Sequence, residues 1–119
     1  MRHVLRLHGV VLGWSDLERA EPELGRARGR FRPGFGYELV QPVFRLYAEA
    51  VPRGQANPVD SEKLERYYRS RDALALELHD AAGERIATNV IHIADYTADA
   101  PGEIELDVLI GDEGYWAKR

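Results

Sequence analysis

Hydrophobic and polar residues alternate in the C-terminal half of the chain. Leucine takes every second position from Leu74 to Leu78, which is the period of a strand with one buried face. Residues 80–83 have turn-forming composition, and Gly83 suits the positive-φ position of a hairpin turn. We therefore expect two paired strands over 74–80 and 85–93. The resulting register sets Leu78 opposite Ile86, Leu76 opposite Thr88, and Leu74 opposite Val90.

Three further segments have the character of strands. Residues 103–110 alternate cleanly, with four aliphatic side chains on one face and Glu103, Glu105 and Asp107 on the other. Residues 3–12 are apolar on both sides, which predicts one central strand. Residues 25–33 carry an arginine at every second position and are expected to be extended.

Helical spacing is confined to the middle of the chain. Pro42 suits a first helical turn, and the apolar stripe that follows it ends before Pro52. A second helix is expected from Asp60, whose side chain can cap it. Ser15 and Glu18 have the spacing of a capping box, which predicts one more short helical turn.

These elements predict a single α+β domain over residues 1–119. We expect a mainly antiparallel five-stranded sheet, with elements in the order strand, strand, helix, helix, strand, strand, strand, and the two helices packed on one face.

Composition narrows the class of protein. The chain has no cysteine, which excludes disulfides and thiol chemistry and is compatible with a reducing compartment. No segment reaches the roughly 18 uncharged residues that a membrane span needs. We therefore expect a cytoplasmic protein with no membrane contact. The net charge of -4 combines a balance of +3 over residues 1–53 with -7 over residues 54–119.

The arginine row is the sharpest candidate binding site in the sequence. Guanidinium groups at alternate positions project from one face of a strand and can bind phosphates or carboxylates, and nearby aromatic rings can stack on bases. The alternative is that the row lies across the sheet from Glu103, Glu105 and Asp107, which repeat at the same spacing. We favour this alternative, because the chain as a whole is acidic. The candidate binding residues are Arg26, Arg28, Arg30, Arg32, Phe35 and Tyr37.

Catalytic chemistry has few candidates. In the expected hairpin His92 lies on the leucine face opposite Asp72, close to Asp95, which would suit an acid/base pair in a small enzyme. A histidine held in the sheet by a carboxylate is the commoner arrangement. His3 and His8 point to opposite faces of one strand, and no metal-binding motif is present, so neither a metal nor another cofactor is expected.

We therefore expect a small binding or accessory domain that acts on another protein without catalysis. Tyr115 and Trp116 lie near the C-terminus and would suit a homodimer interface. An enzyme that uses His92 with Asp95 is the first alternative, and binding of an anion or a nucleic acid by the arginine row is the second. A protein partner is expected more than a nucleic-acid partner.

Overall fold

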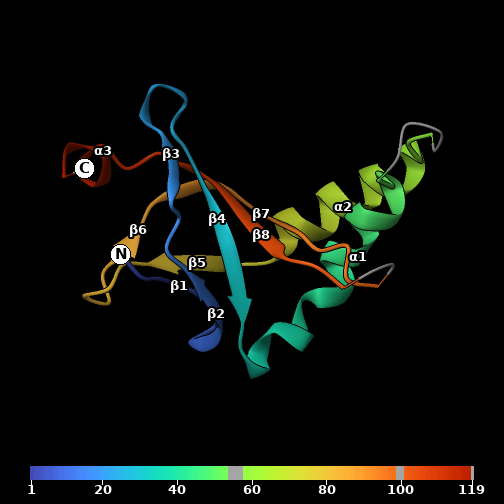
Figure 1. Ribbon diagram of the computed structural model, residues 1–119, viewed down its shortest axis with the longest axis horizontal. Coiled ribbons are helices and arrows are strands. Elements are labelled where there is room, and N and C mark those ends of the chain that lie inside the picture. Colours follow the sequence, from blue (N-terminus) through green and yellow to red (C-terminus); the bar gives the residue numbers. More distant parts are fainter. Residues whose placement is uncertain (54–57, 99–100, 119) are drawn as a thin grey trace.

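The computed structural model describes residues 1–53, 58–98 and 101–118, which form a mixed fold of strands and helices (Figure 1). The strands are β1 (His3–Leu7), β2 (Val10–Ser15), β3 (Arg19–Glu21), β4 (Arg26–Pro33), β5 (Leu76–His79), β6 (Arg85–Ile86), β7 (Thr88–Ala94) and β8 (Ile104–Ile110). The α-helices are α1 (Gln41–Ala50), α2 (Ser61–Ala73) and α3 (Glu113–Ala117), and the 3₁₀ helices are η1 (Pro22–Leu24) and η2 (Phe35–Leu39).

The strands form one antiparallel sheet that curls back on itself. Their order is β6-β5-β1-β2-β4-β8-β7, with β3 also paired to β4. The two ends of this order, β6 and β7, are separated in sequence by Ala87 alone. Since consecutive residues cannot lie far apart, the ends meet there and the sheet is nearly a barrel (Figure 1). The prediction of five strands is therefore wrong, although the mainly antiparallel sheet is confirmed.

The first predicted strand is a hairpin. It breaks at His8 and Gly9, whose φ values of 49° and 80° are both positive, as a tight two-residue hairpin turn requires. Strands β1 and β2 therefore pair with each other. The sequence predicted one continuous strand because both sides of this segment are hydrophobic. The turn itself contains only one glycine and no proline, so it is weakly marked.

The predicted C-terminal hairpin is confirmed at its turn, but the strand pairing predicted beyond that turn is wrong. Asp80 donates its backbone N–H to Glu84 O at 2.8 Å, and Leu78 lies opposite Ile86. The chain then leaves the hairpin, and β7 pairs along β8 instead. The predicted register would have exposed Ile91 and Ile93, whereas the structure buries both against the interior side chains of β8. Burial of these isoleucines explains the change of partner.

The core lies between the inner faces of the curled sheet and continues under the helices. The alternation predicted for β8 is confirmed, with its four aliphatic side chains buried. The largest fully buried side chains are Tyr67, Phe31, Phe44, Leu5, Leu12, Leu17, Leu78, Ile93 and Leu106.

Both predicted helices are confirmed, and they pack on each other and against β7. The prediction of two helices is nevertheless wrong, because α3 follows β8. Asp60 caps α2 by accepting a hydrogen bond from Lys63 N at 3.1 Å. The pair lies to one side of the barrel in Figure 1. Within the described residues, no helix has the length and apolar character to cross a membrane.

The prediction of a capping box at Ser15 is wrong. Ser15 ends β2, and its hydroxyl accepts a hydrogen bond from Leu17 N at 3.1 Å. The Glu18 carboxylate accepts from Arg30 N on β4 instead of capping its own segment. A backbone N–H of the partner strand therefore occupies the carboxylate acceptor that a capping box would have used, and the chain bends into β3.

Candidate functional site

The arginine row lies beside the acidic row of β8, as the favoured alternative predicted. In the register of β4 and β8, Arg28 faces Asp107 and Arg30 faces Glu105. Arg26 makes two hydrogen bonds to Asp107, at 3.0 and 2.6 Å, and Arg30 lies 3.8 Å from Glu103. These contacts show that much of the row stabilises the sheet.

One more partner of the row comes from β3, where Glu21 lies 3.0 Å from Arg28. Arg19 of the same strand pairs with Glu105 of the acidic row. Arg32 is different: its guanidinium lies 4.8 Å from the centre of the Trp14 ring, and it forms no ion pair with any described carboxylate. The row is thus divided between three paired arginines and one that remains available.

His92 is half-buried among aromatic rings of the two helices. Its ring is 4.4 Å from that of Tyr47, centre to centre, and its Nδ1 shares a hydrogen bond with the Tyr67 hydroxyl. Burial lowers the pKa of His92 from 6.5 to about 4, and Asp107 opposes that shift only in part. His92 is therefore a neutral packing residue at physiological pH.

Asp95 lies at the end of β7 on the opposite face from His92. It is fully buried, and its carboxylate accepts hydrogen bonds from the Tyr37 hydroxyl at 2.7 Å, Gln41 Nε2 at 3.1 Å and the Thr97 hydroxyl at 2.6 Å. Burial acts to raise the pKa of Asp95, but the hydrogen bonds from Thr97, Tyr37 and Gln41 outweigh it and hold that pKa below its ordinary value. Asp95 therefore ties the end of β7 to η2 and α1.

The structure does not bring the predicted acid/base residues together. Burial alternates over residues 91–95, with Ile91, Ile93 and Asp95 buried and His92 half-buried, so Asp95, which directly follows β7, lies on the opposite face from His92. Asp72 is at the exposed end of α2, 3.1 Å from Arg71. Among the described residues no cluster of three metal-binding side chains occurs.

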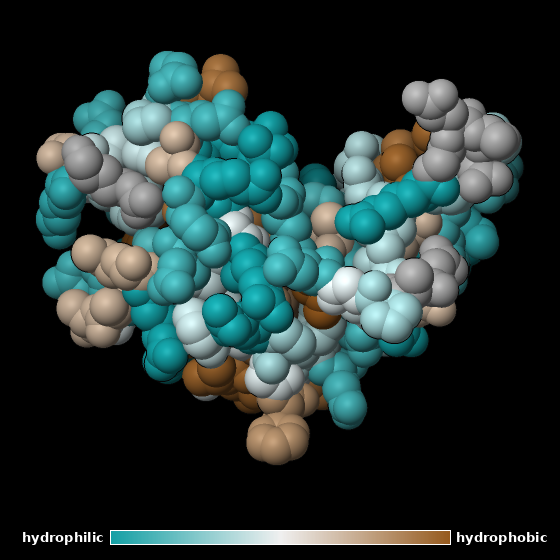
Figure 2. Space-filling model, viewed as in Figure 1, coloured by the Kyte–Doolittle hydropathy of each residue, from teal (hydrophilic) through white to brown (hydrophobic). Residues whose placement is uncertain are grey.

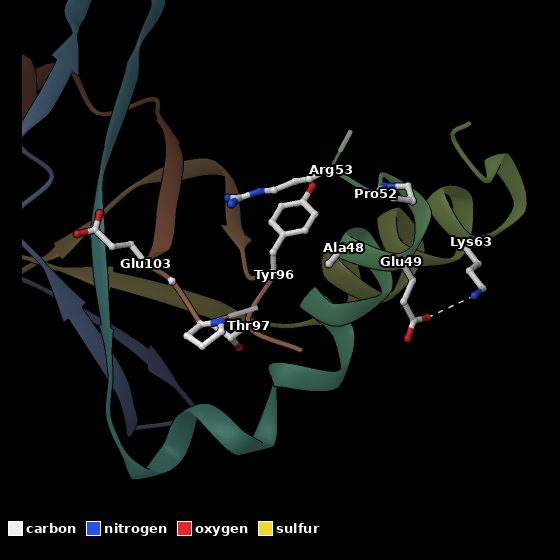
Figure 3. A pocket seen from close by; sticks show the side chains of 10 residues that line it. Ala48, Glu49, Pro52, Arg53, Lys63, Tyr96, Thr97 and Glu103 are labelled. Carbon is white, nitrogen blue, oxygen red and sulfur yellow. Dashed lines mark ion pairs between the residues drawn. The ribbon is translucent and has the colours of Figure 1, made fainter. Parts of the chain in front are cut away.

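A cleft of about 690 Å³ separates the helical pair from the loops at the end of the barrel. Figure 3 shows Arg53 reaching over Tyr96, and its guanidinium lies 4.3 Å from the ring centre. On the far wall Lys63 lies 3.5 Å from Glu49 (Figure 3). The charged lining residues that the structure describes are two cations and two carboxylates, which do not select one class of ionic ligand.

A patch of exposed apolar side chains on β2 and η2 is the strongest candidate site. It comprises Val10 and Val11 of β2, which are 44% and 46% exposed, and Phe35 and Leu39 of η2, which are 104% and 63% exposed. Figure 2 shows hydrophobic side chains along the lower edge of the molecule, where Figure 1 has the β1–β2 turn and the segment after β4. Exposed apolar side chains gathered in one place mark interaction surfaces.

Helix η2 is fixed to the barrel from two sides. Gly34 N donates to Leu12 O at 2.8 Å, and the backbone at Gly36 comes so close to β2 that a Cβ there would overlap Val11 O and lie 2.9 Å from Val10 Cγ1. On the inner side, Tyr37 is buried against Phe31 and hydrogen-bonded to Asp95. Burial and the bond to Asp95 raise the pKa of Tyr37, so its hydroxyl stays protonated and donates. Phe35 is therefore held outward by a rigid support.

Substitution of Gly36 by alanine is expected to move η2 away from β2 and to cost about 1–3 kcal/mol of stability. The atom that the new Cβ meets is a backbone oxygen, which cannot rotate aside. Urea denaturation measures the cost. Gly102→Ala is the control, because a Cβ there meets nothing within 4 Å. Equal stability of the two variants would contradict the close packing of η2.

Sequence reasoning placed Phe35 and Tyr37 together as rings for stacking, and the structure separates them. Phe35 is exposed and Tyr37 is buried. The patch itself was missed, because Val10 and Val11 were assigned to a buried strand. The pair His8-Gly9 was the available signal for a turn, which would have placed both valines near the surface.

Comparisons of the chain with protein-family models, curated proteins and solved structures gave no match.

Proposed function

We propose that this chain is a protein-binding domain that acts without catalysis, and that the apolar patch is its contact surface. The observation that carries the proposal is the complete exposure of Phe35 on a helix fixed to the barrel. The backbone that carries the ring is already ordered, so binding would have to order only the side chain itself. Its burial by a partner would contribute roughly 2–3 kcal/mol.

The surface beside Phe35 also has the shape of a contact site. A depression of about 370 Å³ lies next to the ring and is lined by Pro33, Tyr37 and Gln41 among others. A projecting ring beside a depression lets a partner both cover the ring and insert a side chain of its own. Interfaces concentrate their binding energy in such central aromatic contacts.

The alternatives receive less support from the described geometry. An enzyme that uses His92 and Asp95 would need both groups at one cavity, whereas they lie on opposite faces of β7. Binding of an anion by the whole arginine row would need free guanidinium groups, whereas Arg26, Arg28 and Arg30 lie within 4.0 Å of carboxylates. A homodimer is one form of the proposal, with a second copy as the partner.

The proposal includes a cytoplasmic location, with which the absence of cysteine is compatible. Fractionation of cells that express the chain tests it, and recovery outside the cytoplasm would contradict this part.

Phe35→Ser is expected to weaken binding of the natural partner at least about tenfold, because the buried ring contact is lost. The measurement is affinity purification from the source organism with the wild-type chain and two variants, with each recovered protein quantified. The control is Leu24→Ser, since Leu24 on η1 is also apolar and is 61% exposed. Recovery of the same proteins with all three baits would contradict the proposal. Analytical ultracentrifugation shows whether the partner is a second copy.

A further inference from the structure

We infer that the partner presents carboxylates beside its apolar side chains, as an acidic and hydrophobic peptide segment does. The inference rests on the proposed function and specifies its partner. It follows from three arginines near the apolar patch, Arg2, Arg6 and Arg32, none of which pairs with a carboxylate in the part of the chain that the structure describes.

Arg6 lies directly opposite Val11 of the patch in the pairing of β1 with β2. Its Nε is buried and has no hydrogen-bond partner among the described residues. Glu77 is opposite Arg6 on β5, but its carboxylate lies 3.0 Å from His79 and 3.9 Å from Arg85. Arg6 is therefore a cation at the border of the patch whose charge remains to be matched.

Arg2 and Arg32 are held together by Trp14. Their guanidinium groups lie 4.1 and 4.8 Å from the centre of its ring. Trp14 is opposite Arg32 in the pairing of β2 with β4, and Arg32 comes three residues before Phe35. Stacking on an aromatic ring orients a guanidinium group and leaves its N–H donors free for a carboxylate.

Carboxylates near this surface are fewer than the cations. Glu38 of η2 is exposed within the patch region, and Asp16 lies 3.8 Å from the N-terminal amine. Farther along β4, Arg26, Arg28 and Arg30 each have an acidic partner. Among the arginines of the sheet strands, those that pair with carboxylates are Arg19, Arg26, Arg28, Arg30 and Arg85, whereas Arg6 and Arg32 beside the patch form no ion pair with a described residue.

A protein partner fits these observations better than a nucleic acid does. Two guanidinium groups already lie over the Trp14 ring, where a base would stack. The patch offers Phe35 and Leu39 for apolar side chains, which a phosphate backbone does not supply.

The test is selection of a random 12-residue peptide library on the immobilised full chain. Selected peptides are then titrated by fluorescence anisotropy against the wild type, Phe35→Ser and the double variant Arg2→Glu with Arg32→Glu. The matched controls are Leu24→Ser for hydrophobicity and Arg69→Glu for charge. Arg69 is exposed on α2 and forms no ion pair with a described residue. Circular dichroism checks that every variant is folded.

We expect selected peptides to combine aromatic or aliphatic residues with Asp or Glu. The double arginine variant should bind these peptides about tenfold more weakly than the wild type does, and added salt should weaken the binding as well. Arg69→Glu should leave the affinity unchanged.

Two results would overturn the inference while the proposed function stands. One is selection of peptides without acidic residues whose affinity falls with Phe35→Ser and is unaffected by the arginine changes. The other is preferential binding of a labelled single-stranded oligonucleotide that is lost in the double arginine variant, with Phe35-dependent peptides still selected. If no selected peptide depends on Phe35, the proposed function itself fails.

Discussion

Substitution of Asp95 by alanine is expected to lower the free energy of unfolding by about 4 kcal/mol, because several buried donors lose their acceptor at once. The donors are the Tyr37 hydroxyl, Gln41 Nε2, and the N–H and hydroxyl of Thr97. They come from η2, α1 and the end of β7, so one carboxylate joins three segments. Chemical denaturation followed by circular dichroism measures the loss.

Asp72→Ala provides the matched control for this measurement. Asp72 is exposed, and its ion pair with Arg71 is of the surface kind, worth about 0.5 kcal/mol. If Asp95→Ala were no less stable than Asp72→Ala, Asp95 would not have the structural role assigned to it. The same result would reopen its role in chemistry.

Acid is expected to destabilise the protein through His92, by about 3 kcal/mol between roughly pH 6.5 and pH 4. Burial lowers the pKa of His92 in the folded state to about 4, whereas the unfolded chain has the ordinary value of 6.5. The unfolded state therefore takes up a proton in this window that the folded state does not. The stabilisation that comes from neutral His92 is complete above pH 6.5 and is lost as the pH falls toward 4.

His92→Gln is the variant that isolates this effect, because glutamine keeps a polar group near Tyr67 and does not titrate. Unfolding free energies measured across the pH range should fall more steeply for the wild type than for His92→Gln. Parallel curves for the two proteins would show that His92 is not buried as a neutral ring.

Much of the fold could be predicted where local pattern and tertiary environment agree. The alternation of β8, the capping of α2 by Asp60 and the turn at Gly83 are local features, and the structure confirms them. Strand β7 was paired wrongly because both of its faces carry apolar residues. Only the competition between β5 and β8 for this strand decides that Ile91 and Ile93 face inward.

The candidate site shows the same limit. Pairing of Arg26 and Arg30 with the acidic row was predictable, because both rows repeat every second residue. The exposure of Phe35 was not, since it depends on how closely Gly36 approaches β2. The sequence places Phe35 and Tyr37 two residues apart with similar rings, and only the position of Asp95 assigns Tyr37 to the interior.

Site-specific photo-crosslinking in living cells tests the central claim most directly. A p-benzoylphenylalanine residue in place of Phe35 reports which protein covers the patch, and the same residue in place of Leu24 reports chance contacts. We predict a defined crosslinked protein from position 35 that is absent from position 24. Failure to crosslink at position 35, or the same products from both positions, would contradict the assignment of the apolar patch as the contact surface.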